Sequence, residues 1–293
     1  MKMHISTFIV VSASFLPSVF CWGSLGHYTV AYIASNFVTN ATQAKFQGIL
    51  NDTSADYLAS VATYADSYRY TDEGGYSKPF HYIDANDNPP ASCGVDYSRD
   101  CGSEGCIVSA INNYTERVQS STLSSADVTL AAKMLVHFIG DIHQPLHDEN
   151  LAVGGNDIPV TFDGKPTNLH AVWDTSIPEK YAGKASLEGA QTWATTLSTA
   201  IKSGSYKSSA KSWLAGMDIS DAVTSSMIWA TDSNSYVCSS VMPNGSTETE
   251  NVDLSGDYYA EALPIIQLQI AKAGYRLAAW LNLIATGSTC IQG

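Results

Sequence analysis

The stretch DVTLAAKMLVHFIGDIHQPLH, residues 127–147, decides the fold class of this chain. Its apolar side chains recur at the spacing of a buried helix face, namely Leu130, Met134, Leu135, Phe138 and Ile139. We expect Asp127 to cap the start of this helix and Pro145 to force its end. Gly140 and Asp141 stand among these apolar residues, although a glycine and a charged residue both destabilise a buried helix locally. Core packing alone does not require them, so they indicate a function for this end of the helix.

Two further segments show helical periodicity. After Gly26 and His27, one stripe is formed by Val30, Ile33, Ala34 and Phe37. A second helix is expected from about 260 to 285, with Pro264 in its first turn, where a missing N–H is tolerated. Its apolar side carries Ile266, Ile270, Leu277, Leu281 and Ile284.

The other predicted elements are small. Residues 158–162 followed by Asp163 and Gly164 predict a β-hairpin, because an Asp-Gly pair favours a tight hairpin turn. Residues 86–106 are rich in Asp, Asn, Pro, Gly and Cys, and are expected to form a long loop held by disulfides. We find no repeat and no linker. The sequence therefore predicts a mainly α protein, a single helical domain with a small β-hairpin.

The composition excludes two classes of protein. Of the 293 residues, 45% are hydrophobic and only 15% are charged, so the chain can bury a large core and is not intrinsically disordered. Its formal net charge is −13, which excludes binding of polyanions through a broad basic surface. If the protein acts on nucleic acid or phosphate, bound metal must supply the positive charge.

Residues 1–21 are typical of a secretory signal peptide, with Lys2 at the charged start and an apolar stretch behind it. The alternative, a transmembrane anchor, is disfavoured because the span is short and is interrupted by Ser6, Ser12, Ser14, Pro17 and Ser18. We expect cleavage after Cys21, so that Trp22 becomes the N-terminus of a secreted, extracellular domain of residues 22–293.

Sequons and cysteines agree with secretion. The four candidate glycosylation sites are Asn40, Asn51, Asn113 and Asn244. In an oxidising compartment, the cysteines left after cleavage favour disulfides over metal ligation; they are Cys93, Cys101, Cys106, Cys238 and Cys290. Because five is an odd number, at least one thiol lacks an intramolecular partner, and Cys290 near the C-terminus is expected to be that one.

Histidine and aspartate are paired twice at one spacing. His137 and Asp141 lie four residues apart on the predicted helix, so both point to one face. His170 and Asp174 repeat the spacing. A single pair of this kind is usually a surface contact, but two pairs connected through residues 140–147 indicate a metal centre. Imidazole mixed with carboxylate is a ligand set suited to zinc.

Further candidate ligands lie outside these pairs. Asp66 and His81 come earlier in the chain, and His147 ends the stretch quoted above. His143 is different, because six residues after His137 it points away from the ligand face. We expect His143 to form a structural hydrogen bond.

Together these residues resemble the fungal and plant single-strand-specific zinc nucleases of the S1/P1 type, whose fold is shared with bacterial zinc phospholipases C. The resemblance runs over essentially the whole mature chain. Its most specific marks are WGSLGH at 22–27, Ala65-Asp66, His81, GDIHQPLH at 140–147 and NLHAVWD at 168–174.

The resemblance implies three Zn²⁺ ions. The first is held by Asp66, His81, His137 and Asp141, and the second by His147, His170 and Asp174. The third is held by the α-amino nitrogen and carbonyl oxygen of Trp22, by His27 and by Asp141, which bridges two ions. The resemblance also pairs Cys93 with Cys238 and Cys101 with Cys106.

The resemblance further implies an endonuclease that hydrolyses single-stranded DNA and RNA to 5′-phosphate products and also acts on 3′-mononucleotides. No segment after residue 21 has an uninterrupted apolar run of spanning length, so we expect no membrane, and we expect no obligate protein partner. Asp66 orients the attacking water, and Arg69 stabilises the phosphoryl transition state. Tyr82 stacks on an unpaired base and Asp84 accepts hydrogen bonds from its edge, opposite an apolar wall of Val153 and Gly154. The alternatives from the residues alone are an ordinary exposed arginine at 69 and core packing for Tyr82.

Two other functions compete with a nuclease. A zinc phospholipase C on the same scaffold needs an open apolar approach for lipid, and that family typically has Glu where this chain has Asp174. A secreted, non-catalytic metal-binding or glycoprotein module is the third possibility. It is disfavoured because every ligand position is filled.

Overall fold

The computed structural model describes residues 22–291, so the predicted signal peptide and its cleavage after Cys21 lie outside the described residues. The described chain is mainly helical, as predicted, with one small sheet. Its longer helices are α1 (Ser24–Phe37), α2 (Asn40–Leu50), α5 (Ile107–Gln119), α6 (Ser125–Asp141), α9 (Leu187–Lys202), α10 (Ala222–Tyr236) and α12 (Asp257–Thr286). The short helices are α3 (Tyr64–Tyr68), α4 (Tyr97–Asp100), α7 (Leu169–Ala171), α8 (Ile177–Ala182) and α11 (Ser246–Thr249).

Tight turns and two strands complete the chain. The 3₁₀ turns are η1 (Ala59–Val61), η2 (Gly75–His81), η3 (Pro145–Asp148), η5 (Ala210–Leu214) and η6 (Ile219–Asp221). Two π-helical turns are η4 (Val172–Ser176) and η7 (Val237–Val241). The strands are β1 (Pro159–Phe162) and β2 (Lys165–Asn168).

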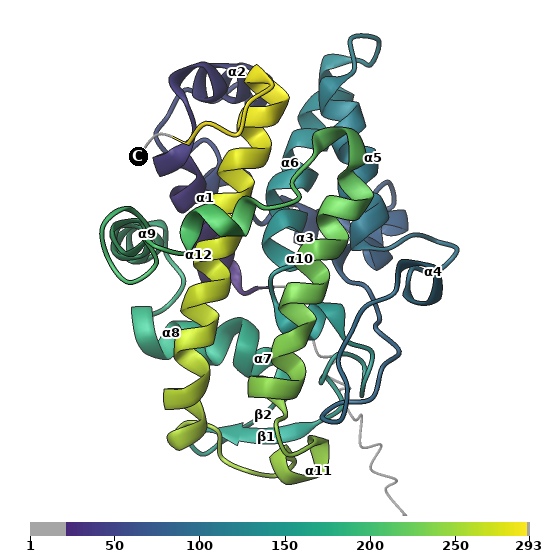
Figure 1. The fold of residues 1–293 in the computed structure, drawn as a ribbon, viewed down its shortest axis with the longest axis vertical. Coiled ribbons are helices and arrows are strands. Elements are labelled where there is room, and N and C mark those ends of the chain that lie inside the picture. Colours follow the sequence, from purple (N-terminus) through teal and green to yellow (C-terminus); the bar gives the residue numbers. More distant parts are fainter. Residues whose placement is uncertain (1–21, 292–293) are drawn as a thin grey trace, which may run out of the picture.

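The long helix α12 runs along the length of the molecule and organises the others (Figure 1). Helix α1 packs against both α12 and α9, while α6 packs against α5, and α10 packs against α5 and η3. Four tryptophans are fully buried in this core, Trp22, Trp173, Trp229 and Trp280. The rings of Trp229 and Trp280 meet edge to face with centroids 5.2 Å apart, an arrangement that aromatic pairs prefer.

Helix α6 carries the predicted apolar face and ends before Pro145, but its predicted cap is wrong. The cap is Ser124, whose Oγ accepts the N–H of Asp127 at 3.1 Å. Asp127 lies inside the first turn instead, where its charge suits the helix dipole. The helix ends at Asp141, four residues before Pro145, which begins η3.

The C-terminal helix was placed correctly, but its start was not. It begins at Asp257, so Pro264 lies in the second turn rather than the first. All five predicted apolar side chains of this helix are buried: Ile266, Ile270, Leu277, Leu281 and Ile284. Their burial against the core outweighs the one backbone hydrogen bond that proline removes. The predicted stripe of α1, formed by Val30, Ile33, Ala34 and Phe37, is also buried.

The predicted hairpin is confirmed. Strands β1 and β2 pair antiparallel, with Phe162 opposite Lys165. The connecting residues Asp163 and Gly164 have positive φ values of 49° and 71°, as a turn of this length requires.

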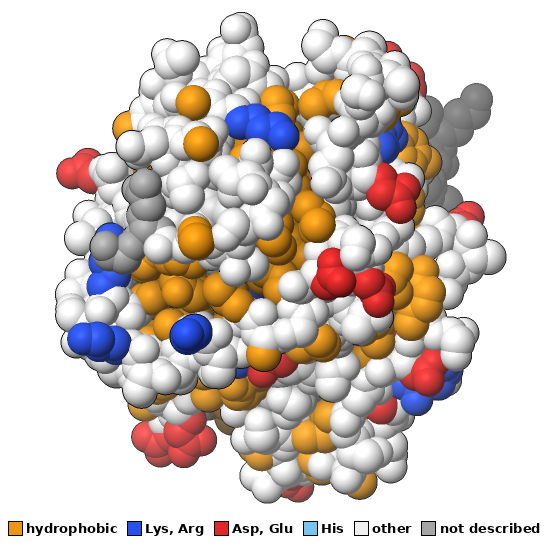
Figure 2. All heavy atoms as spheres, turned by 45° about the horizontal axis from the view of Figure 1, so that its top comes forward, with side chains coloured by type: hydrophobic (Ala, Val, Ile, Leu, Met, Phe, Trp, Pro, Cys, Tyr) orange, Lys and Arg blue, Asp and Glu red, His pale blue; other side chains and the backbone are white. Residues whose placement is uncertain are grey.

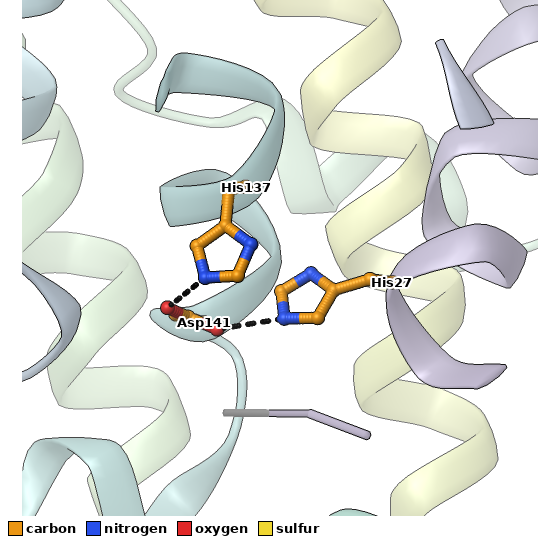
Figure 3. A group of neighbouring side chains, drawn as sticks. All are labelled: His27, His137 and Asp141. Carbon is orange, nitrogen blue, oxygen red and sulfur yellow. Dashed lines mark ion pairs between the residues drawn. The ribbon is translucent and has the colours of Figure 1, made fainter. Parts of the chain in front are cut away.

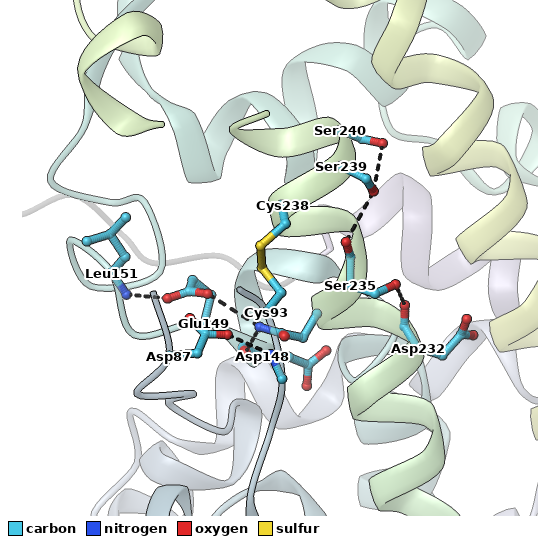
Figure 4. Close-up of a disulfide and its surroundings, with 12 residues drawn as sticks. Asp87, Cys93, Asp148, Glu149, Leu151, Asp232, Ser235, Cys238, Ser239 and Ser240 are labelled. Carbon is cyan, nitrogen blue, oxygen red and sulfur yellow. Dashed lines mark hydrogen bonds between the residues drawn. A yellow bond between two sulfur atoms is a disulfide. The ribbon is translucent and has the colours of Figure 1, made fainter. Parts of the chain in front are cut away.

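Two disulfides fix the loop that precedes α5. Cys93 is bonded to Cys238 and Cys101 to Cys106, as the resemblance implied, and Cys290 is free and exposed. The first bond ties this loop to η7 beside the acidic side chains drawn in Figure 4. The loop is not wholly irregular, because it contains the short helix α4.

The surface agrees with the acidic composition. On the face drawn in Figure 2, acidic and basic side chains lie in small separate groups, so this face offers no continuous basic track. All four sequon asparagines, Asn40, Asn51, Asn113 and Asn244, are exposed. Among the described helices, none combines the length and the apolar character needed to cross a bilayer.

Candidate metal centre

The candidate ligands come from distant parts of the chain and meet near the C-terminal end of α6. Trp22 precedes α1, which carries His27; Asp66 lies in α3, His81 ends η2, and α6 supplies His137 and Asp141. His147 lies in η3, His170 in α7 and Asp174 in the π-helical turn η4. π-helical turns are frequent at functional sites, because they re-aim side chains.

Asp141 is the centre of the first group of ligands. Its Oδ1 lies 3.0 Å from Nε2 of His27, and its Oδ2 lies 2.9 Å from Nε2 of His137 (Figure 3). Oδ2 also lies 3.0 Å from Nδ1 of His81. The ring of His27 stacks on that of His137 with centroids 4.0 Å apart. His137 and Asp141 therefore share one helix face, as their spacing predicted, and the carboxylate has one oxygen for each of two neighbouring sites.

Asp66 extends this group toward solvent. Its Oδ1 is 3.7 Å from Nε2 of His137 and 4.0 Å from Nδ1 of His81. The guanidinium of Arg69, one turn later, reaches the same oxygen at 3.5 Å. Arg69 is only 5% exposed, so the alternative of an ordinary exposed arginine is wrong. Its guanidinium carbon also lies 5.2 Å from the ring centre of Tyr70.

The second group is formed by His147, His170 and Asp174. Nε2 of His170 lies 3.0 Å from Oδ2 of Asp174, and Nε2 of His147 lies 3.9 Å from Oδ1. The two imidazoles stack with centroids 5.0 Å apart. All three side chains are buried, so this group is separated from bulk water except through the cavity described below.

Main-chain carbonyls orient three of the imidazoles. Nδ1–H of His137 donates to the carbonyl of Ala62 at 2.7 Å, and Nδ1–H of His170 donates to that of Gly154 at 2.7 Å. Nδ1–H of His147 donates to the carbonyl of His81 at 2.8 Å. Each bond fixes the tautomer that leaves Nε2 as the metal-binding atom, which is the usual arrangement around protein metal sites.

Glycines make room for the N-terminal turn, and this explains the unusual Gly140 of α6. A Cβ at Gly140 would lie 2.9 Å from Nδ1 of His27, so only glycine lets His27 reach Asp141. At Gly23, a Cβ would lie 2.9 Å from the carbonyl oxygen of Asp174. The N–H of Gly23 donates to that carbonyl at 2.9 Å, which anchors the chain next to the fully buried Trp22 against Asp174.

The charges around Asp141 favour a cation. Burial alone would raise the pKa of Asp141, but the imidazoles of His137 and His27 outweigh it and hold this pKa well below the ordinary value. Burial would likewise lower the pKa of His137, yet the carboxylates of Asp141 and Asp66 raise it to about 9. A metal ion between these groups supplies the same positive charge that protons otherwise supply.

The donor atoms fit metal ions better than they fit one another. In the described part of the chain, several buried atoms of the candidate ligands have no hydrogen-bond partner, among them Nδ1 of His27, Nε2 of His147 and Oδ2 of Asp174. A buried polar atom without a hydrogen-bond partner destabilises a protein interior unless a water molecule or an ion binds it. Nitrogen and carboxylate donors converging at these distances are suited to zinc.

A cavity of about 310 Å³ leads to these ligands. The buried His81, His147 and His170 line it together with Arg69, Tyr82, Asp84, Val153 and Gly154, so the predicted substrate residues are brought together. Tyr82 is 37% exposed, and the alternative that it packs in the core is therefore wrong. Burial and the charge of Asp100 raise the pKa of Asp84. Because burial removes water from this carboxylate, a hydrogen-bond donor on a bound ligand would take the place of that water.

Some residues of the site carried no sequence signal. Lys78, Tyr70 and Asn156 also line the cavity. Gln144 donates a hydrogen bond to Asp174, 30 residues away in the chain. His143 is structural, as predicted: Nδ1–H donates to the carbonyl of Ile139, and Nε2 accepts from Nη1 of Arg276 at 2.9 Å.

Comparison with known proteins agrees with this geometry. The family model described as S1/P1 Nuclease matches residues 22–286. Nuclease S1 of Aspergillus oryzae is 57% identical over 265 residues, which cover 90% of this chain and 92% of that protein. Nuclease P1 of Penicillium citrinum is 52% identical over 90% of this chain and 97% of its own length. Endonuclease 4 of Arabidopsis thaliana is 32% identical over 94% and 93%, respectively. This chain therefore belongs to the S1/P1 nuclease family and is a phosphodiester-hydrolysing nuclease.

Proposed function

We propose that this protein is a secreted zinc-dependent endonuclease that cleaves single-stranded DNA and RNA to 5′-phosphate products and also removes phosphate from 3′-mononucleotides. The observation that carries the proposal is the cavity that joins two His/Asp groups to an exposed tyrosine. One end of this cavity suits a phosphate beside metal, and the other suits an unpaired base.

Three Zn²⁺ ions would be held by the residues described above. Asp66, His81, His137 and Asp141 would bind the first ion, and His147, His170 and Asp174 the second. His27 and Asp141 would bind the third together with the amine and carbonyl of Trp22. When bound, zinc would stabilise charge on the phosphate and on the leaving 3′-oxygen and make water a better nucleophile.

The protein's own side chains would orient the reaction. Asp66 faces the first group from the solvent side and would accept a hydrogen bond from the attacking water. Arg69 is held against Asp66 and lines the cavity, where its guanidinium would stabilise negative charge on the phosphoryl oxygens in the transition state. The buried ligand groups exclude bulk water, which strengthens both interactions.

Single-strand preference would follow from the outer part of the cavity. A base held between Tyr82 and the apolar wall of Val153 and Gly154 must leave its stack, which costs little in a single strand and requires unpairing in a duplex. Asp84 would accept a hydrogen bond from the base edge.

The proposal includes the maturation of the chain. Residues 1–21 would be removed as a signal peptide, leaving residues 22–293 as the zinc-dependent nuclease domain. The exposed Asn40, Asn51, Asn113 and Asn244 would be glycosylation sites on the extracellular protein.

Metal removal tests the proposed function. We expect EDTA to abolish cleavage of single-stranded DNA and to lower the melting temperature, because an ion present at about 1,000 times its Kd adds about 4 kcal/mol of stability per site. Zinc should restore both, and mapping of the product ends should give 5′-phosphates. Full activity in a verified metal-free sample would contradict the proposal, and hydrolysis of phosphatidylcholine in place of DNA would favour the phospholipase alternative.

Replacing Tyr82 with alanine separates binding from chemistry. Loss of base stacking, about 1–3 kcal/mol, should raise KM about 5- to 150-fold and weaken base preference while leaving zinc content unchanged. Tyr97 is a matched control, because it is also 37% exposed and does not line the cavity. Unaltered KM and base preference in Tyr82→Ala would show that this ring is not the stacking surface.

A further inference from the structure

Gln144 contacts a candidate metal ligand from inside the core. Its side chain is fully buried, and its Nε2–H donates to Oδ1 of Asp174 at 2.6 Å. Its Oε1 accepts the N–H of Leu146 at 2.6 Å. Because Gln144 follows Asp141 by three residues and precedes His147 by three, it ties the segment between the two ligand groups to the carboxylate of the second group.

The hydrogen bond determines which oxygen of Asp174 faces His170. With Oδ1 held by Gln144, Oδ2 is left 3.0 Å from Nε2 of His170 and has no hydrogen-bond partner among the described residues. The main chain of Asp174 is fixed separately, since its carbonyl accepts the N–H of Gly23. The side-chain torsions of Asp174 are therefore the freedom that remains, and the hydrogen bond from Gln144 restrains them.

We propose that Gln144 is a positioning residue for metal binding, which holds the Asp174 carboxylate in the orientation that binds an ion with His147 and His170. The inference rests on the proposed function, in which this group holds one Zn²⁺. Hydrogen bonds to ligating groups typically change metal affinity about 10- to 100-fold when they are removed.

A neutral amide is the side chain that this position requires. It offers a donor to Asp174 and an acceptor to Leu146 at the same time. Glutamate has nearly the same shape and keeps the acceptor, but an ionised glutamate would offer no donor and would place a second negative charge beside Asp174. Methionine fills a similar volume and removes both hydrogen bonds.

Gln269 is a matched control. It is also fully buried, and its Nε2–H donates to the carbonyl of His143 at 3.0 Å, on the same segment as Gln144. This bond reaches a main-chain atom rather than a ligand side chain. Gln269→Met should therefore lower stability without changing metal affinity.

The experiment measures zinc content of the mature protein across a series of chelator-buffered zinc concentrations. We expect Gln144→Glu and Gln144→Met to bind one ion about 10- to 100-fold more weakly, with the other ions unaffected, and Gln269→Met to bind all ions as the wild type does. Wild-type affinity in both Gln144 variants would overturn the inference. Equal weakening in Gln269→Met would also overturn it, because the effect would then be general loosening of the segment.

The same titration separates this inference from the proposed function. Asp174→Ala should lose the ion that the Gln144 variants bind weakly. If Asp174→Ala keeps the full zinc content of the wild type, the metal assignment itself is wrong and the inference about Gln144 fails with it. If Asp174→Ala loses an ion and the Gln144 variants do not bind it more weakly, only the inference about Gln144 fails.

Discussion

Asp141→Ala is expected to lower kcat/KM by at least about 10³-fold, more than the 10²–10³ that loss of a single transition-state hydrogen-bond donor costs. The reason is geometric. One carboxylate oxygen faces His27 and the other faces His137 and His81, so a single truncation removes a ligand from two proposed ions. Three buried imidazoles would also lose the negative charge that they face, which destabilises the fold.

Metal content decides whether this loss of activity has the proposed cause. Asp141→Ala should bind fewer zinc ions than the wild type, and Asp141→Asn should show the effect of charge at almost constant shape. Asp127→Ala is the control on the same helix, since Asp127 lies in its exposed first turn and pairs with Arg117 at 3.2 Å. An Asp141→Ala protein that retains the wild-type number of ions would refute the bridging role.

Adding one residue before Trp22 is expected to remove most phosphodiester cleavage while the fold and both disulfides persist. A backbone amide cannot donate a lone pair to zinc as a free α-amine does, so the proposed third ion would lose a ligand. Trp22 is fully buried, and the N–H of Gly23 is bonded to the carbonyl of Asp174, so Trp22 lies next in the chain to a residue that contacts a proposed ligand.

A single preparation provides its own control for the terminus. The extended chain can carry a protease site that ends directly before Trp22, and activity and zinc content are then measured before and after cleavage. We expect both to rise on cleavage, with activity increasing about 10²-fold or more if the third ion contributes as much as one strong transition-state contact. Equal zinc content and equal rates before and after cleavage would show that the terminus is not a ligand.

Periodicity predicted α1, α6 and α12, because burying an apolar face decides where they form, whereas α2, α5, α9 and α10 were not predicted. It predicted the starts of α6 and α12 poorly. Ser124 and Asp127 are both good capping residues within one turn, and the sequence alone does not show which of them the incoming chain favours. The sequence predicts Pro264 in the first turn, because a proline further inside a helix removes a backbone hydrogen bond. In the structure, the burial of Ile266 and Ile270 offsets this loss, and the helix begins earlier, at Asp257.

Some features of the site were predictable from the residues alone, and others were not. The His137–Asp141 pair follows from helix geometry, but the grouping of ligands from α1, α3 and η4 came from the family resemblance and not from spacing. Burial of Arg69 depends on its contacts with Asp66 and Tyr70, and no local pattern signals it. Gln144 was missed because its partner lies 30 residues away, and a glutamine beside a proline has an ordinary structural explanation.

The main-chain carbonyls that accept from His137, His147 and His170 have a consequence for how this enzyme can diverge. A carbonyl is present whatever residue occupies its position, so substitution at Ala62 leaves the acceptor of His137 in place provided that the backbone holds its course. The orientation of the His137 imidazole is therefore insulated from a side-chain change at Ala62, whereas the acceptors of His147 and His170 belong to His81, a proposed ligand, and to Gly154, where a Cβ would lie 2.6 Å from the carbonyl oxygen of Leu146. Substitution at Ala62 can therefore alter the surface around His137 without changing which nitrogen of this imidazole faces Asp141.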